Sequence, residues 1–460
     1  MVATPLLPGA TPAPTAASPA SPRLAWPDVA KGVSILGVVV LHVSLVVPYG
    51  TDSFIAQVNH LLDPLRMPLF FLVSGMFSTK ILRYSLWDLF SRRLWFFVVP
   101  YVVWAPVEIF AAEYERSIWP DYELPGVWHY VVLIAQALNM YWFLYVLVAF
   151  NLIAWLTRRL PRWAALLISL SPILLLPLNA QVDTVGKFIM YLPIFIVGLR
   201  WSQSVRGFAG RGFTPGAIVG STCAYVAGFG CYAVWYLLVE RGMSDMPWRL
   251  WPWDPTATIE PNDLWTLVRG GGQVLMLPVA VLAAVGVARV PYLSRALQFL
   301  GRNTLPIYLG HPLALTLLYR LPMSLSGGRE LHPEAERIVD RPGVWIALAM
   351  VCALSGGVVM WPYSTGADCG VDSAPTTDRG PSLVVEDGGG APGAWKRGPR
   401  GGGTRCATRH SATACGGCSR PGAAGNSDVG RQRRLWDGMS GPGAGGVDKL
   451  SQTARGYTRP

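Results

Sequence analysis

The chain has 460 residues, of which 52% are hydrophobic and only 14% charged, whereas soluble domains carry roughly 25% charged residues. This composition argues against a soluble globular protein. The formal net charge of +11 would suggest nucleic-acid binding in a soluble chain. Here the basic residues gather in loops between apolar runs, which is typical of a membrane protein. We therefore expect no nucleic-acid partner.

The two ends of the chain differ in composition from its middle. Residues 1–22 are mostly Pro, Ala, Ser and Thr, without the features of a signal peptide or a spanning helix. Residues 362–460 are rich in Gly, Arg and Pro and cannot bury a core. We expect both ends to be disordered, and we interpret the abrupt change after Trp361 as a shifted reading frame or an unselected extension. Residues 23–361 are predicted to form the membrane-embedded domain.

Ten apolar runs follow one another through this domain, and each can cross or nearly cross roughly 30 Å of hydrocarbon. They lie at about 28–48, 62–80, 93–112, 130–156, 163–179, 186–202, 214–238, 265–288, 299–319 and 343–361. The fourth run is too long for a simple span, so its first part is expected to be re-entrant or interfacial. The sequence predicts an all-α bundle of about ten transmembrane helices in a multi-pass protein of the cell membrane.

Basic and acidic residues alternate between the loops, which predicts the orientation of the bundle. With the N-terminus inside, the cytosolic loops hold the following cations: Lys80, Arg83, Arg92, Arg93, Arg158, Arg159, Arg162, Arg200, Arg206, Arg211, Arg289, Arg295 and Arg302. The outer loops hold these acids: Asp52, Glu113, Glu115, Asp121, Glu123, Asp183, Asp245 and Asp254. Because cytoplasmic loops carry the excess of Lys and Arg, we expect a cytoplasmic N-terminus.

The first apolar run carries a titratable residue at depth. Asp28, Lys31 and Gly32 stand at its start and His42 in its outer half. Lys31 and His42 are eleven positions apart, about three helical turns, so they share one face. At 1.5 Å per residue His42 lies about 21 Å beyond Asp28. An imidazole there is costly unless it is functional or paired. The alternative is a structural hydrogen bond to a neighbouring helix.

Five blocks in the same order resemble motifs of the acyltransferase 3 family, in particular the branch of the fucose 4-O-acetylases. They are Asp28-x-x-Lys31-Gly32 with His42, the block 67–77 (MPLFFLVSGMF), Arg92-Arg93 with Pro100, Tyr101 and Trp104, the block 141–144 (YWFL), and the block 301–312 (GRNTLPIYLGHP). The resemblance covers residues 26–312. It implies a membrane enzyme that moves an acyl group, in this branch acetyl, from cytosolic acyl-CoA to a hydroxyl of a sugar or cell-envelope glycan, without a permanently bound cofactor.

The resemblance also assigns roles to residues. A sugar hydroxyl needs a base near neutral pH, and the proposed catalytic histidine of the family matches His42. Donor phosphates need fixed cations, for which Arg92 and Arg93 are candidates together with Lys31 and Arg302. The alternative for these cations is plain positive-inside charge.

The remaining candidates serve the thioester oxyanion and the acceptor. Ser74, Arg302, Asn303 and His311 are possible donors to the oxyanion, and Asp28 can give structural support. His311 lies roughly 13 Å into its span, where it can approach the depth of His42, and is taken with His42 as a catalytic candidate. Tyr141 and Trp142 are assigned to the acceptor side. Alternatively, Ser74 permits close helix packing and His311 is a structural histidine.

The chain departs from the family pattern at three positions. Arg66 stands where the related branch commonly has histidine, and Phe96 and Phe97 stand where another basic residue is common after the arginine pair. Outer-loop tryptophans at 248–265 are interface anchors or a stacking surface for a sugar. In the tail, the cysteines and histidine at 406–418 do not follow a common zinc pattern, so no metal site is expected.

Three alternatives to an active acyltransferase with direct transfer stay open. The acyl group can pass through an enzyme-bound intermediate before it reaches the acceptor. A polytopic transporter or carrier of an envelope intermediate would also place ionisable residues inside the membrane. A damaged reading frame would leave an inactive product.

Overall fold

The computed structural model describes residues 24–47, 50–118, 122–179, 182–240, 261–326 and 342–362. The predicted disordered segment 1–22, the predicted tail 362–460 except for Pro362, which is helical, and most of the tryptophan loop lie outside these residues. Within the described residues the secondary structure is helical, without strands. The main helices are α1 (Ala25–Val46), α2 (Phe54–Phe77), α3 (Leu86–Leu89), α4 (Trp95–Arg116), α5 (Val127–Ala135), α6 (Trp142–Leu156), α7 (Arg162–Leu170), α8 (Thr184–Arg200), α9 (Ser202–Arg211), α10 (Pro215–Glu240), α11 (Pro261–Val287), α12 (Pro291–Arg302), α13 (Thr304–Ala314), α14 (Leu321–Leu325) and α16 (Pro342–Val359).

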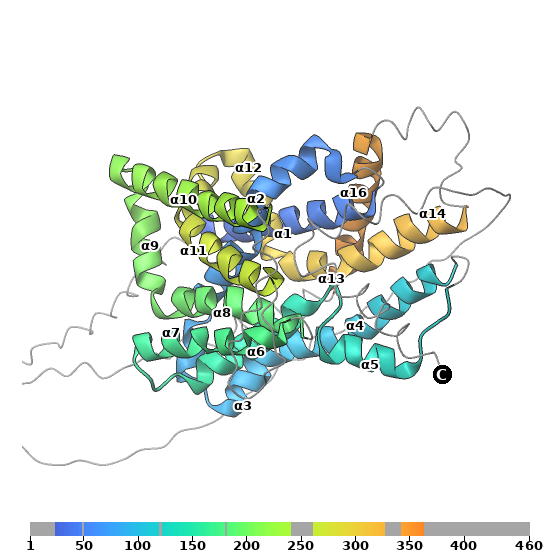
Figure 1. Ribbon diagram of the computed structural model, residues 1–460, viewed down its shortest axis with the longest axis horizontal. Coiled ribbons are helices and arrows are strands. Elements are labelled where there is room, and N and C mark those ends of the chain that lie inside the picture. The colour runs from blue at the N-terminus through green and yellow to red at the C-terminus, as the bar shows by residue number, and fades with distance from the viewer. Residues whose placement is uncertain are drawn as a thin grey trace, which may run out of the picture.

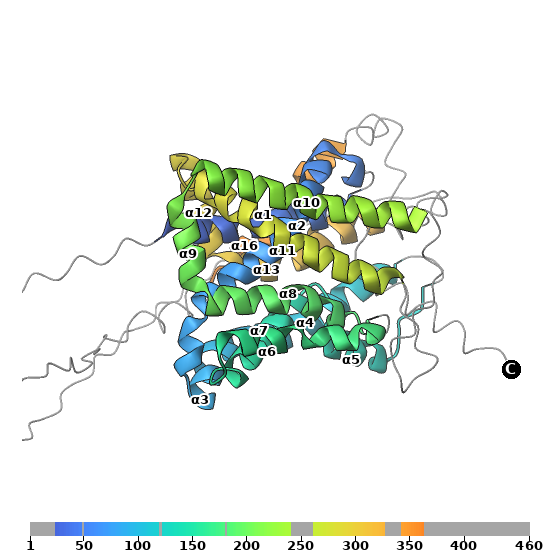
Figure 2. The same ribbon diagram turned by 60° about the vertical axis from the view of Figure 1, so that its left-hand side comes forward.

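Helix α8 lies at the centre of the bundle. It packs against α2, α6, α7 and α11, and Figures 1 and 2 show it between a group formed by α4–α7 and a group formed by α10–α12. Helix α1 contacts α2, α11, α12, α13 and α16. Helix α13 contacts α1, α4 and α16, so it connects the first helix to the group formed by α4–α7.

Four helices are long and apolar enough to cross a membrane: Ala25–Val46, Leu86–Arg116, Pro215–Leu238 and Asp263–Val287. A fifth crossing results if α8 and α9, which meet at an angle of 80°, form one broken span. The prediction of an all-helical membrane fold is therefore confirmed in this coarse form. The number of ten spans and the cytoplasmic N-terminus stay predictions.

The outward faces of the helices are apolar. Large exposed hydrophobic side chains include Phe110, Val226, Leu318 and Val351. An apolar surface spread over several helices is unfavourable in water but matches the hydrocarbon of a bilayer. This distribution agrees with the membrane environment expected from the composition.

The long run at 130–156 is interrupted, as its length suggested. Helix α5 ends at Ala135 and α6 begins at Trp142, and Ala137 between them has a φ of 53°, in the left-handed region that a residue with a Cβ rarely adopts. Such a conformation costs of order 1 kcal/mol and persists only where neighbouring contacts stabilise it. The break turns the chain directly beside the core.

Glycines allow backbone contact between helices that are distant in sequence. A Cβ on Gly301 of α12 would lie 1.8 Å from the carbonyl oxygen of Asp28 in α1, and a Cβ on Gly32 would lie 2.1 Å from the carbonyl oxygen of Leu297. Small residues are favoured at membrane helix interfaces for this reason. The start of α1 is thereby packed directly on α12.

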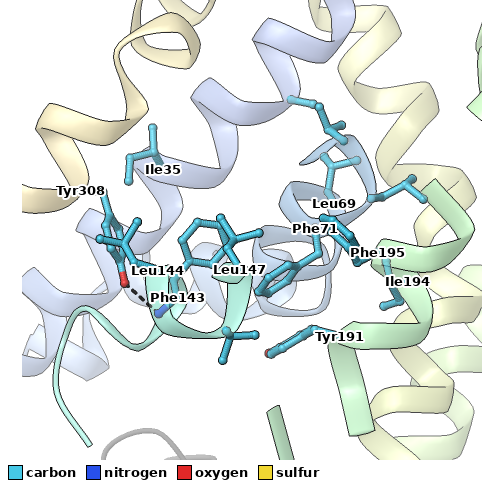
Figure 3. Packing of buried hydrophobic residues seen from close by; sticks show 14 of the residues in the cluster. Ile35, Leu69, Phe71, Phe143, Leu144, Leu147, Tyr191, Ile194, Phe195 and Tyr308 are labelled. Atoms are coloured by element: carbon cyan, nitrogen blue, oxygen red, sulfur yellow. Dashed lines mark hydrogen bonds between the residues drawn. The ribbon is translucent and has the colours of Figure 1, made fainter. Parts of the chain in front are cut away.

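An aromatic core connects α2, α6, α8 and α13. Figure 3 shows Phe71 of α2 near Phe143 of α6 and Tyr191 of α8, with Tyr308 of α13 beside Phe143. The ring centroids of Phe71 lie 4.9 Å from those of both Phe143 and Tyr191. Aromatic pairs at this separation add to the free energy gained from burial. The core therefore fixes the positions of the helices that surround the candidate site.

Candidate active site

Two histidines from distant parts of the chain meet inside the bundle. His42 lies in α1, and His311 lies 269 positions later, in α13. The His42 Nδ1 atom is 2.9 Å from the His311 Nε2 atom, and the rings are nearly parallel, with an interplanar angle of 8° and centroids 5.1 Å apart. His311 is completely buried, whereas His42 is half-buried. His42 is therefore the more accessible member of the pair.

The hydrogen bonds of the pair determine which nitrogen carries each proton. The His311 Nδ1 atom lies 3.0 Å from the carbonyl oxygen of Ile307, one turn earlier in α13. Because a carbonyl oxygen only accepts, His311 Nδ1 donates, and in the neutral ring its Nε2 has a lone pair. The His42 Nδ1–H then donates to this lone pair, and His42 Nε2 is the unprotonated nitrogen. A general base with its tautomer fixed by a partner has this arrangement.

Two tyrosine hydroxyls fix α13 against the start of α6. The Tyr308 hydroxyl donates to the carbonyl of Met140 at 2.7 Å and accepts from the N–H of Phe143 at 3.2 Å, the bond drawn in Figure 3. The Tyr141 hydroxyl donates to the carbonyl of Leu309 at 2.5 Å. These bonds set the rotation of α13 and, with it, the direction of its histidine. Tyr141 is completely buried and acts here as a tie between helices.

The strained loop between α5 and α6 is stabilised by a small polar network. The Asn139 Nδ2 atom donates to the Tyr101 hydroxyl at 3.1 Å, and Asn139 Oδ1 accepts from the N–H of Tyr141 at 2.9 Å. The Tyr101 hydroxyl donates to the carbonyl of Ile134 at 2.6 Å. Since Tyr141 contacts α13, the network connects the third helix motif with the histidine pair.

A buried cation of α2 lies close to α1 before His42. The Arg66 Nη1 atom donates to the carbonyl of Gly37 at 3.4 Å, and the Asn59 Nδ2 atom donates to the same carbonyl at 3.2 Å. Arg66 is only 4% exposed. A Cβ on Gly37 would lie 2.6 Å from the Arg66 Cδ atom, so glycine makes the room for this side chain. Sequence reasoning recorded Arg66 only as a departure from the family pattern and did not identify Asn59.

The predicted donor-side cations gather at the N-terminal end of α1. Lys31 Nζ lies 4.5 Å from the ring centroid of Phe77, at the end of α2, and the Arg93 Nη2 atom donates to the hydroxyl of the neighbouring Ser78 at 2.9 Å. The Arg302 Nε atom lies 3.3 Å from Asp28 Oδ2. Lys31 precedes His42 by eleven residues, about 16 Å at 1.5 Å per residue. One end of the bundle thus carries these cations, and the histidine pair lies deeper along α1.

The two adjacent arginines point in different directions. They lie in a π-helical turn, Phe90–Leu94. Arg92 is 66% exposed and pairs with Asp88 at 3.0 Å, whereas Arg93 is half-buried and also lies over the ring of Phe97. An extra residue in a helical turn changes which side chain faces the bundle. The structure directs Arg93 inward and Arg92 outward.

The other predicted residues occupy supporting positions. Asn303 ends α12 and donates through Nδ2 to the carbonyl of Phe299 at 2.7 Å. Ser74 is 6% exposed and lies next to Gly75, where α2 meets α8. Arg302 lies beside Asp28, so Arg302 and Asn303 are at the end of the bundle away from His42. Their location suits the phosphate end of a donor better than its thioester.

Trp142, assigned to the acceptor side, is covered by two side chains. Lys187 Nζ lies 5.0 Å from its ring centroid, and the Tyr191 ring stacks at 6.1 Å. Lys187 is only 5% exposed and pairs with Asp183 at 2.7 Å. Trp142 therefore contacts a buried cation, which periodicity did not predict because the lysine lies inside an apolar run.

A second polar cluster lies at the far end of α4. Glu115 accepts from Arg320 Nη2 and from the Ser324 hydroxyl, both at 2.6 Å, and so connects α4 to α14. Glu113 pairs with Arg116 and accepts from the Tyr122 hydroxyl. Burial and this hydrogen bond raise the pKa of Tyr122, in the loop after α4, to about 12. The phenol is therefore a donor at neutral pH, and the cluster is structural.

The structure thus brings together His42 and His311 at depth and the cations Lys31 and Arg93 at one end of α1. Among the described residues, no group of three or more His, Cys, Asp or Glu side chains could hold a metal ion. The catalytic and binding roles of these residues stay predictions. The long-range partners, such as the carbonyl of Leu309 that accepts from the Tyr141 hydroxyl, have no signal in the sequence.

Comparison with known proteins identifies the family. A family model described as an acyltransferase domain matches residues 24–363, which is more than half of the chain. Neither the curated proteins nor the solved structures gave a match to this chain. The matched residues include all five motif blocks and both histidines of the pair. The chain therefore belongs to the acyltransferase 3 family and is a membrane acyltransferase by family.

Proposed function

We propose that this protein transfers an acyl group, most simply acetyl, from acyl-CoA to a hydroxyl of a sugar or cell-envelope glycan. The observation that carries the proposal is the hydrogen-bond chain from His42 through His311 to the carbonyl of Ile307, inside a bundle of this family. A half-buried imidazole whose unprotonated Nε2 is directed by a buried partner ring is suited to remove a proton from an alcohol.

In the proposed reaction, His42 Nε2 takes the proton of the acceptor hydroxyl as the oxygen attacks the thioester carbonyl. The tetrahedral intermediate collapses with cleavage of the carbon–sulfur bond, and the departing thiolate takes the proton from His42. The products are the ester and CoA. His311 does not react: its Nε2 lone pair accepts from His42 Nδ1–H throughout and stabilises the charged ring between the two proton transfers.

The charge that develops on the thioester oxygen needs nearby donors or cations. The buried guanidinium of Arg66 donates to the carbonyl of Gly37, which precedes His42 by five residues in α1. We therefore propose Arg66 as the group that stabilises the oxyanion. Its positive charge would favour the anionic intermediate over the neutral thioester.

We further propose that the donor enters at the N-terminal end of α1. Lys31, Arg93 and Arg302 lie at that end, about 16 Å along α1 from His42 for Lys31. Phosphates at the cations would leave the pantetheine arm to extend toward the histidines. In a ten-span topology with a cytoplasmic N-terminus in the cell membrane, this end faces the cytosol, where acyl-CoA is found.

Family membership favours an acyltransferase over a transporter of an envelope intermediate. Direct transfer is the simpler version, because His42 needs only to act as a base. Its rival is an acyl group carried on the enzyme. Incubation with radiolabelled acetyl-CoA and no acceptor separates them, since only a covalent route leaves label on denatured protein.

The test of the function is removal of the base. In membranes containing the full chain, His42→Ala should lower the rate of acetyl transfer to envelope glycan by about 10²- to 10⁴-fold, the usual contribution of a general base. CoA binding by the purified variant is the control for folding. Wild-type turnover by the variant, measured by release of the CoA thiol, would remove His42 from the mechanism.

A further inference from the structure

Three helices end side by side at the end of the bundle that carries Lys31. Helix α2 ends at Phe77, α6 at Leu156 and α8 at Arg200. A Cβ on Gly75 would lie only 3.0 Å from the backbone nitrogen of Leu199, so the last turns of α2 and α8 are in backbone contact. The α6 end joins them through the segment that follows α2, because the Trp155 Nε1 atom donates to the carbonyl of Tyr84 at 2.8 Å.

Two half-buried arginines lie at these helix ends. Arg93 Nη2 donates to the hydroxyl of Ser78, directly after α2, at 2.9 Å, and Arg200 Nη2 donates to the carbonyl of Thr157, directly after α6, at 2.5 Å. Both Nε atoms are buried and lack a hydrogen-bond partner. Within the described part of the chain, neither guanidinium forms an ion pair with a carboxylate.

A helix C-terminus compensates such cations only in part, because its dipole amounts to about half a negative charge. A guanidinium has five N–H donors in a planar fork, and each of these two arginines uses one Nη group in a bond to the protein. Removing a cation from water without an opposite charge is unfavourable. Both side chains thus have charge and donor capacity that a doubly charged oxyanion would satisfy in bidentate fashion.

We infer that Arg200, together with Arg93, binds a phosphate group of the CoA donor. The inference rests on the proposed function and adds to it a residue that no motif block contains. The phosphate would lie where α2, α6 and α8 end, near the Lys31 ammonium, which contacts Phe77 at the end of α2. Arg92, which is exposed and paired with Asp88, lies outside this site. The plain alternative is that Arg200 only caps α6.

The experiment measures CoA binding to the purified full chain in detergent by calorimetry. Arg200→Gln keeps a side-chain donor for the Thr157 carbonyl but removes the charge, and Arg200→Lys keeps the charge but not the fork. Arg158→Gln is the matched control, because Arg158 Nη1 also donates to a carbonyl at the end of α6, that of Trp155, at 3.1 Å.

We expect the Kd for CoA to rise about 10- to 150-fold in Arg200→Gln, because a hydrogen bond to a charged group is lost. The Kd should rise less in Arg200→Lys. In the control Arg158→Gln it should rise by under about twofold. Unchanged CoA binding by Arg200→Gln would overturn the assignment of Arg200 while leaving the proposed function intact. Failure of the wild type to bind CoA would overturn both. Equal weakening by Arg158→Gln would show capping instead.

Discussion

The histidine pair makes a quantitative prediction about catalysis. If His311 acts only by accepting the His42 Nδ1–H, its removal should cost what one hydrogen bond to a charged ring is worth. The 2.9 Å bond is single and partly buried, and hydrogen bonds to charged groups contribute about 1.5–3 kcal/mol. At 1.36 kcal/mol per tenfold change, His311→Leu should lower kcat by about 10- to 150-fold.

A matched substitution separates the hydrogen bond from the packing. Gln and Leu have similar volumes, but the amide oxygen of Gln can accept from His42 Nδ1–H. His311→Gln should therefore retain most of the activity that His311→Leu loses. The assay is single-turnover release of the CoA thiol from acetyl-CoA with envelope glycan as acceptor, in proteoliposomes containing equal amounts of folded protein.

The double variant supplies the decisive comparison. Because the proposed role of His311 is exerted through His42, His311→Leu should have no further effect on a protein that already carries His42→Ala. Multiplicative losses in the double variant would show that His311 acts on the substrate independently. Equal activity of the Leu and Gln variants would refute the hydrogen-bond reasoning altogether.

Two further predictions concern stability, and both are measured as the unfolding midpoint in detergent. Gly301→Ala should destabilise the protein by about 3 kcal/mol or more, because its methyl group would lie 1.8 Å from the Asp28 carbonyl oxygen. The control is Gly220→Ala, which has open space around the Cβ and should stabilise α10 by up to about 1 kcal/mol. Equal unfolding midpoints of the two variants would contradict the packing of α1 on α12. Glu115→Gln should cost about 2–3 kcal/mol through its bonds to Arg320 and Ser324, and an unchanged midpoint would show that this cluster does not stabilise the fold.

Much of the fold and part of the site follow from the sequence through local periodicity. The apolar run that contains Lys31 and His42 is a helix, and its rise of 1.5 Å per residue separates the two as expected. The length of the run at 130–156 indicated a break, and α5 and α6 are separate helices. These features depend on residues within one segment of chain, so a single sequence contains the information.

The remaining features depend on contacts between segments. The bond of His42 to His311 requires α1 and α13 to pack with a particular rotation. The bonds of Tyr308 and Tyr141, which join α13 to the start of α6, determine this rotation. The inward direction of Arg93 follows from a π-helical turn that a period of 3.6 residues does not describe. Periodicity also gives no account of why these helices pair, since lipid offers no apolar driving force between them.

The separation of the two histidines has a consequence for biosynthesis. A ribosome inserts the segment with His42 early, but the ring that fixes its tautomer arrives 269 residues later. Until then, the nascent protein contains Lys31 and His42 but not the hydrogen-bond partner of His42. In the proposed mechanism the base reaches its full strength only after α13 has been inserted, so a chain divided between Glu240 and Pro261 should reach full activity only when its two fragments assemble.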